Sequence, residues 1–269
     1  MSLPAPEDMK LLAALARIAL DAGGAIRRIE AAGITARTKA DASLVTDADQ
    51  AAEDLICPAL AALLPDVPII AEEAMSAGCD VTIGPRFLLV DPLDGTREFV
   101  SGNGEYTVNI ALVEHGTPTF GVVYAPAKGL LYAAAPGGAF KADRAPEAEV
   151  ASEGWTRIRC RPRPSGPLRI AASRSHADPQ TRALIDSLPV DACISAGSAL
   201  KFGLLADGQV DLYPRLSPVM EWDSAAGHAV VAAAGGRLLR PDGQPLTYGH
   251  PENGFKVAGF IAEGAPAPA

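Results

Sequence analysis

The most informative segment of the chain holds two aspartates three positions apart, in the order Asp91-Pro92-Leu93-Asp94-Gly95-Thr96. It directly follows the apolar run 87–90, which is typical of a strand buried on both faces. The proline fixes one backbone dihedral and the glycine permits a tight turn, so both carboxylates can converge at the strand end with the leucine carbonyl between them. Such an oxygen-rich set suits a hard cation such as Mg²⁺. The threonine is expected to cap a short helix, whose free N–H groups suit an anion.

Further carboxylates stand at other predicted element boundaries. Glu72 and Glu73 follow the apolar stretch 67–71, Asp47 and Asp49 stand where a helix begins, and Asp223 opens an alanine-rich helix. Taken singly, each of these residues, like Asp94, is explained equally well by a helix cap or a solvated strand end. Carboxylates within a few ångströms of one another repel unless cations lie between them. If these groups converge, metal binding is the physical reason.

The ordered set resembles the inositol monophosphatase superfamily of metal-dependent, lithium-sensitive phosphatases. The resemblance covers residues 39–236 and rests on the turn described above and on the segments Leu44-Val45-Thr46-Asp47-Ala48-Asp49, Ala71-Glu72-Glu73 and Trp222-Asp223-Ser224-Ala225-Ala226-Gly227. It implies an α/β (α+β layered) fold, the alternating α-β-α-β-α sandwich of that family. It also implies an active site between the two halves of the chain.

The resemblance implies a role for each matching residue. Two or three Mg²⁺ ions per site would be bound by Glu72, Asp91, the Leu93 carbonyl, Asp94 and Asp223. Asp49 and Thr96 would orient the attacking water, Glu72 would also serve catalysis, and Gly95 and Thr96 would bind the phosphate. Metal ions at such a site lower the pKa of a water and neutralise a leaving oxygen, so hydrolysis needs no covalent phosphoenzyme.

Three segments of the second half resemble the 3′(2′),5′-bisphosphate nucleotidase branch of CysQ type: Ala172-Ser173-Arg174-Ser175-His176, Gly197-Ser198-Ala199-Leu200-Lys201 and Asp211-Leu212-Tyr213-Pro214-Arg215. That branch hydrolyses adenosine 3′,5′-bisphosphate (PAP) to AMP, and the family suggests a place in sulfate assimilation. A second phosphate requires cations away from the metals, and arginine forks suit phosphate. The expected substrate-binding residues are Gly95, Thr96, Arg174, His176, Gly197, Ser198, Lys201 and Arg215. The charged ones are also explained as ordinary surface residues.

Two other functions stay open at this stage. The first is an inositol monophosphatase or a broad sugar phosphatase, but inositol phosphatases commonly carry a carboxylate shortly before the Trp–Asp motif, and residues 215–220 have none. The second is a non-catalytic regulatory protein on the same fold, which the complete set of metal-ligand residues disfavours.

The elements that must position these residues follow from hydrophobic periodicity. Helices are predicted at 7–31 and 48–64, with Pro58 able to kink or divide the second, and strands at 67–71, 87–90, 106–113, 120–124, 130–134 and 139–141. Later elements alternate as strands at 168–172, 192–195 and 210–213 and helices at 179–188, 198–206 and 222–234. The stretch 142–166, rich in proline, arginine and glutamate, predicts a division into a metal-binding α+β half, 1–155, and a substrate-binding α/β half, 156–269.

Composition limits the partners. The 269 residues carry 23 basic and 32 acidic side chains, a net charge of −9 that would repel a nucleic acid polymer and leaves a small phosphate ester as the expected partner. The four cysteines form no metal-binding spacing and are expected to be buried free thiols. Charged residues interrupt the first apolar segment, which predicts no integral membrane segment and a cytoplasmic location. Peripheral contact with the inner membrane and a homodimer are compatible with these features.

Overall fold

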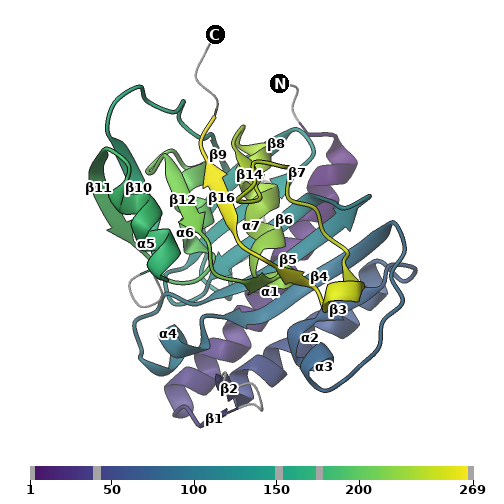
Figure 1. The fold of residues 1–269 in the computed structure, drawn as a ribbon. Helices are drawn as coiled ribbons and strands as arrows, with labels where there is room; N and C mark the ends of the chain where they lie inside the picture. Colours follow the sequence, from purple (N-terminus) through teal and green to yellow (C-terminus); the bar gives the residue numbers. More distant parts are fainter. Residues whose placement is uncertain (1–3, 39–43, 149–153, 174–177, 266–269) are drawn as a thin grey trace.

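The computed structural model describes residues 4–38, 44–148, 154–173 and 178–265 (Figure 1). Within these ranges the larger sheet has seven strands, in the spatial order β3 (Ile69–Ala71), β4 (Arg86–Asp94), β5 (Thr107–Glu114), β6 (Thr117–Ala125), β7 (Leu130–Ala135), β8 (Gly138–Asp143) and β9 (Thr156–Ile158). The first pair, β3 and β4, is parallel, and the others are antiparallel. The parallel pair brings the ends of β3 and β4 to the same edge of the sheet.

A second sheet is formed by the later part of the chain. Its strands, as far as the structure describes them, follow the order β11 (Val190–Ser195), β10 (Leu168–Ala172), β12 (Leu212–Arg215), β16 (Phe260–Glu263) and β14 (Arg237–Leu239). Two small ladders pair β1 (Ala36–Thr38) with β2 (Leu44–Thr46) and β13 (Val219–Met220) with β15 (Lys256–Val257).

The helices are α1 (Pro6–Ala32), α2 (Asp47–Leu63), α3 (Glu72–Ser76), α4 (Thr96–Val100), α5 (Pro179–Asp186), α6 (Leu200–Ala206) and α7 (Glu221–Ala233), with a 3₁₀ turn η1 (Pro251–Asn253). Helix α2 is continuous through Pro58 and is not divided there. None of the helices in the described ranges has the length and apolar character needed to cross a bilayer.

The elements stack as α-β-α-β-α layers. Alternate residues of β4 face opposite ways: Leu88 and Val90 pack with α1 and α2, while Phe87 and Leu89 pack with α6 and α7. The second sheet covers the other side of α6 and α7, and α5 packs on its outer face through Ile185. The expected sandwich is therefore confirmed.

The middle layer lies directly on the larger sheet. A side chain at Gly121 of β6 would place its Cβ 2.4 Å from the Ala226 carbonyl oxygen of α7, so only glycine fits this approach. This contact joins the two predicted halves, because β6 belongs to the half 1–155 and α7 belongs to the half 156–269. Strand β9 begins at Thr156 and pairs with β8. The division at 155 and 156 itself stays a prediction.

Several sequence expectations need correction. The predicted helix 198–206 starts at Leu200, because Ser198 adopts a left-handed φ of 52° that no helix accommodates. The predicted strand 210–213 is displaced to Leu212–Arg215, and β16, which pairs with both β12 and β14, was not predicted. The cysteines are free as expected, but Cys79 and Cys193 are exposed rather than buried.

Candidate active site

A β-bulge at the end of β4 places two aspartates on the same face of the sheet. Asp91 pairs with Asn109 of β5 and Asp94 pairs with Thr107, so two residues of β4 oppose one residue of β5. In a regular strand, residues three apart point to opposite faces. The extra residue cancels that alternation, and both carboxylates face the α7 side of the sheet.

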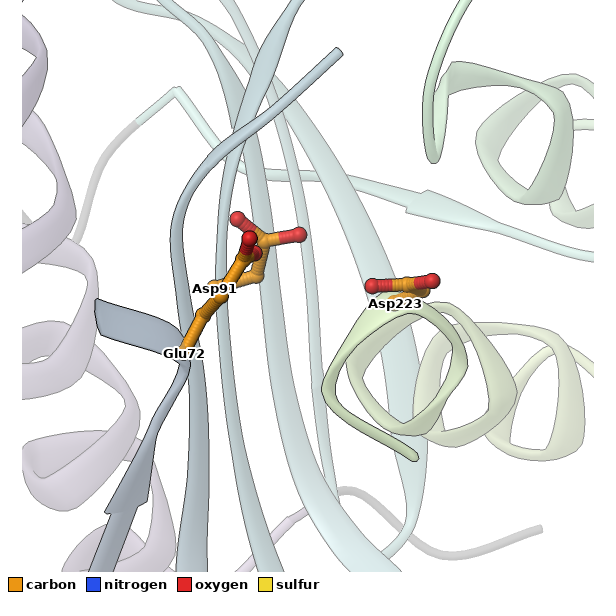
Figure 2. Close-up of side chains that lie close together, drawn as sticks. All are labelled: Glu72, Asp91 and Asp223. Atoms are coloured by element: carbon orange, nitrogen blue, oxygen red, sulfur yellow. The ribbon is translucent and has the colours of Figure 1, made fainter. Parts of the chain in front are cut away.

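Three carboxylates from three different elements meet at this edge. Glu72 is the first residue of α3 and directly follows β3, Asp91 belongs to β4, and Asp223 lies in the first turn of α7. Each offers one carboxylate oxygen, and these oxygens all lie within 4.8 Å of one another. Figure 2 shows Glu72 and Asp91 projecting from adjacent strand ends, with Asp223 at the end of the helix facing them. The neighbouring Glu73 does not join this group of oxygens and lines a different cavity.

The trio lines a cavity of about 300 Å³ together with other residues named from the sequence: Leu93, Asp94, Gly95, Thr96, Ser198, Lys201 and Arg215. The structure thus brings the predicted metal ligands and most predicted phosphate and substrate residues to one place. Arg174 and His176 lie outside the described residues.

Burial and mutual repulsion make this acidic group unstable as free anions. Burial raises the pKa of Asp91 well above its usual range, and the charges of Glu72, Asp94 and Asp223 raise it further. Burial likewise raises the pKa of Asp223 to about 8, with added repulsion from Asp94 and Glu72 that Arg215 partly offsets. An all-oxygen set that repels itself when empty fits a hard divalent cation.

Asp49 lies behind this cavity and is connected to it through Thr96. The Thr96 hydroxyl donates to Asp49 Oδ1 at 3.2 Å, while Asp49 Oδ2 accepts from the Thr46 N–H at 2.7 Å and the Thr46 hydroxyl at 2.6 Å. Burial raises the pKa of Asp49, and the Thr46 hydrogen bonds oppose that rise. A hydroxyl has one proton, so Thr96 can only accept a hydrogen bond from a water in the cavity.

The expected capping role of Thr96 is wrong. Gly95 is the N-cap residue of α4, with a φ of 89°, and Thr96 is the first helical residue. Only a residue that tolerates this left-handed conformation can occupy position 95 without strain. The Thr96 side chain is consequently turned toward Asp49 instead of toward the helix backbone.

A hydroxyl from the second half of the chain contacts Asp94. Ser198 Oγ donates to Asp94 Oδ2, and the Thr107 hydroxyl hydrogen-bonds Ser198 Oγ in turn. Asn109 Nδ2 approaches the same Asp94 oxygen at 3.5 Å. Sequence reasoning missed Thr107 and Asn109. These two residues lie two positions apart on the strand that follows the aspartates, and this spacing was the only sequence feature that could have placed them on the same face as the site.

Lys201 is held more firmly than a surface lysine would be. Its side chain is 3% exposed, and Nζ donates to the Ala196 carbonyl at 3.1 Å and to the Ser198 carbonyl at 2.6 Å. The ammonium group also lies 5.2 Å from the centre of the Tyr213 ring. These oxygens and the ring offset the unfavourable position of a cation in the first turn of α6. Lys201 therefore shapes the 196–198 loop as well as lining the cavity.

Gly197 supports this loop without lining the cavity. Its N–H donates to Glu105 Oε2 at 2.9 Å, and a Cβ at this position would lie 2.6 Å from the Glu105 carbonyl oxygen. Arg97, Glu98, Leu44 and Ser173 line the cavity and were not selected from the sequence. Arg97 directly follows Thr96, and this position could have indicated from the sequence that Arg97 lines the cavity.

Comparisons with known proteins agree with this geometry. The model of the inositol monophosphatase family matches residues 7–262. The 3′(2′),5′-bisphosphate nucleotidase CysQ of Escherichia coli O157:H7 is 42% identical over 252 residues, which cover 93% of this chain and 98% of that protein.

Solved structures extend the likeness to the fold. The crystal structure of CysQ from Bacteroides thetaiotaomicron, described as a bacterial member of the inositol monophosphatase family, superposes with a TM-score of 0.79 at 34% identity and covers 96% of this chain and 97% of that chain. The extragenic suppressor protein SuhB from Bartonella henselae gives a TM-score of 0.75 at 26% identity, covering 95% of this chain and 94% of that chain. With its layered fold and its acidic cavity, the chain belongs to the inositol monophosphatase family, whose members are metal-dependent phosphatases.

Proposed function

We propose that this protein is a 3′(2′),5′-bisphosphate nucleotidase that hydrolyses PAP to AMP and phosphate. The observation that carries the proposal is one cavity that is lined by both carboxylates and cations. Glu72, Asp91, Asp94 and Asp223 contribute the carboxylates, and Lys201 and Arg215 contribute cations. A substrate with a reacting phosphate and a second anionic group matches this combination. The likeness to nucleotidases of CysQ type supports the same substrate class.

The carboxylate group would hold two or three Mg²⁺ ions through Glu72, Asp91, the Leu93 carbonyl, Asp94 and Asp223. When bound, Mg²⁺ at such a site would activate a water and stabilise the charge that develops on the phosphoryl and leaving oxygens. The carboxylates neutralise the charge of the ions and fix their places. The buried position of Asp91 keeps bulk water from competing for its oxygens.

The protein's own groups orient the reactants. Thr96, with its proton committed to Asp49, accepts a hydrogen bond from the attacking water and fixes the direction of its lone pair. The backbone at Gly95 and Thr96 lies where α4 begins and is suited to hold phosphate oxygens. Of the two cations named from the sequence, Arg215 is proposed to bind the second phosphate, because two of the Lys201 protons are already bonded to carbonyl oxygens. Roles for Arg174, His176, Gly197 and Ser198 in substrate binding stay predictions.

The inositol monophosphatase alternative gains no support from the site. The segment between Arg215 and Asp223 contains one carboxylate, Glu221, which is fully buried. Its oxygens accept the N–H groups of Gly249 at 2.7 Å and His250 at 3.0 Å, so it is engaged in the fold. It is therefore not available for the hydroxyl groups of an inositol ring.

A phosphate-release panel tests the proposal. PAP, inositol 1-phosphate and fructose 1,6-bisphosphate are compared in the same buffer, each with Mg²⁺ and with excess EDTA. The expected kcat/KM is at least about tenfold higher for PAP than for inositol 1-phosphate, as one charged hydrogen bond to a second phosphate would give. A preference for inositol 1-phosphate or fructose 1,6-bisphosphate would contradict the proposed substrate. Undiminished hydrolysis in EDTA would contradict the proposed metal dependence. The homodimer, the cytoplasmic location and the peripheral membrane contact stay predictions for sedimentation velocity and cell fractionation.

A further inference from the structure

Helix α3, which carries the metal-ligand candidate Glu72, begins without a cap of its own. It spans only Glu72–Ser76, and its N-cap residue Ala71 has no side chain that can accept a hydrogen bond. The first N–H groups of a helix have no partner within the helix. In a buried setting each such group must find an acceptor elsewhere, or the turn is destabilised.

The acceptor comes from α2. Glu53 Oε2 accepts the Glu73 N–H at 2.9 Å, and Glu53 Oε1 accepts the Ala74 N–H at 2.8 Å. Glu53 is 5% exposed, and α2 and α3 are neighbours in the fold (Figure 1). Both oxygens of one buried carboxylate therefore hold the two peptide groups that directly follow Glu72.

We propose that Glu53 is a positioning residue for the metal site, acting through Glu72, an inference that rests on the proposed metal-dependent function. By fixing the two peptides after Glu72, the Glu53 carboxylate fixes the direction in which the Glu72 side chain leaves the backbone. A Glu72 oxygen lies within 4.8 Å of oxygens of Asp91 and Asp223, and a rotation of α3 would move it away from them.

Helix α2 also supports Thr96, through a residue one turn before Glu53. Asp49, four residues before Glu53 on α2, accepts the Thr96 hydroxyl. Residues four apart lie on one face of a helix, so a single face of α2 supports both the water-orienting threonine and the metal-ligand glutamate. Displacing Glu53 should leave the Asp49–Thr96 contact intact and change only metal binding through Glu72.

The test is a Mn²⁺ titration by calorimetry on the full-length protein without substrate. Glu53→Gln keeps the shape of the side chain but replaces one acceptor oxygen by an NH₂ group that faces a peptide N–H. Loss of a partner that orients a ligand typically weakens metal affinity by about 10–100-fold, and we expect the Kd for Mn²⁺ to rise by about tenfold or more. The matched control is Asp54→Asn, which removes the same charge from the next position of α2, where Asp54 is exposed and bonds Gln50. The control should bind Mn²⁺ like the wild type.

A double-variant comparison separates positioning from a general effect of charge or folding. In a Glu72→Gln background, adding Glu53→Gln should change the Kd by less than about threefold, because the ligand that it positions is already altered. Equal effects in both backgrounds, or an unchanged Kd in the single variant, would overturn the inference. If Glu53→Gln does not fold, Glu53→Asp keeps the charge but is too short to hold both peptides. A wild-type Kd for that variant would be equally decisive against the inference. Failure of the wild type itself to bind Mn²⁺ would instead refute the proposed metal site.

Discussion

The metal-free protein should lose stability as pH rises from 6.5 to 8.5. Burial, with repulsion from Asp94 and Glu72, raises the pKa of Asp223 from 3.8 to about 8 in the folded state. A carboxyl group whose pKa is raised by folding binds its proton more tightly when folded. Its stabilising contribution is therefore complete below pH 3.8 and is lost as pH rises through about 8.

The size of the loss follows from the two pKa values. Integrating proton binding for this one group between pH 6.5 and 8.5 gives a decrease of about 2 kcal/mol in the free energy of unfolding. Asp91, whose pKa is also raised by burial, adds to the decrease. Burial lowers the pKa of His228 to about 4, so this residue acts in the opposite direction, but mainly below the chosen window.

The assay is urea unfolding at both pH values, in EDTA and in Mg²⁺. In EDTA, the wild type should be less stable at pH 8.5, and Asp223→Asn should remove about 2 kcal/mol of that difference. Saturating Mg²⁺ should remove most of the difference, because the ion replaces the proton as the partner of the carboxylates. Asp242→Asn, which alters an exposed ion pair with Arg240, is the control and should leave the pH dependence unchanged. Equal stability at both pH values in EDTA would refute the electrostatic reasoning.

Four substitutions extend the test to catalysis and specificity. Asp94→Asn should lower kcat by about 10²-fold or more while thermal unfolding stays close to wild type, and near-normal turnover in saturating Mg²⁺ would remove Asp94 from the site. Thr96→Val should lower kcat by about 10²-fold with little change in KM, since it removes the group that orients water; a pure KM effect would argue against that role. Arg215→Ala should lower kcat/KM by about 10–100-fold for PAP and far less for a monophosphate, and an equal fall for both would exclude a role in specificity. Lys201→Ala should reduce the free energy of unfolding by about 2 kcal/mol or more in urea titrations, because the Lys201 ammonium donates to two carbonyl oxygens. Wild-type stability of this variant would contradict the structural role and leave only substrate binding for Lys201.

The site residues could be predicted from the sequence where they lie in short segments at element boundaries. Asp91, Asp94, Glu72 and Asp223 each stand at an element boundary that hydrophobic periodicity can locate, and the structure brings all four to one cavity. The pairing of Asp49 with Thr96 is present as the family resemblance implied. The long, strongly periodic helices α1 and α2 differ from the predicted ranges by one residue at each end.

Features that depend on distant pairing were not predictable in this way. The convergence of Asp91 and Asp94 was expected from Pro92 and Gly95, but the bulge that produces it was not. That bulge depends on the pairing of β5 with both ends of the turn, and no local signal encodes this register. The positive φ of Ser198, which delays the start of α6, belongs to a loop held by Lys201 and by the contact with Asp94. Glu53 looked like one of many acidic helix residues, and only its contact with a segment 20 residues away reveals what it does.

The most direct test of the central claim is an anomalous diffraction measurement on crystals grown with Mn²⁺, AMP and phosphate. The metal centre and the phosphate site are proposed to be one cavity, lined by Glu72, Asp91, Asp94 and Asp223 and by Arg215. The anomalous peaks should lie among the four carboxylates, with phosphate beside Gly95 and Thr96 and the nucleotide phosphate near Arg215. Manganese bound at another place, or phosphate bound away from the manganese, would contradict the account.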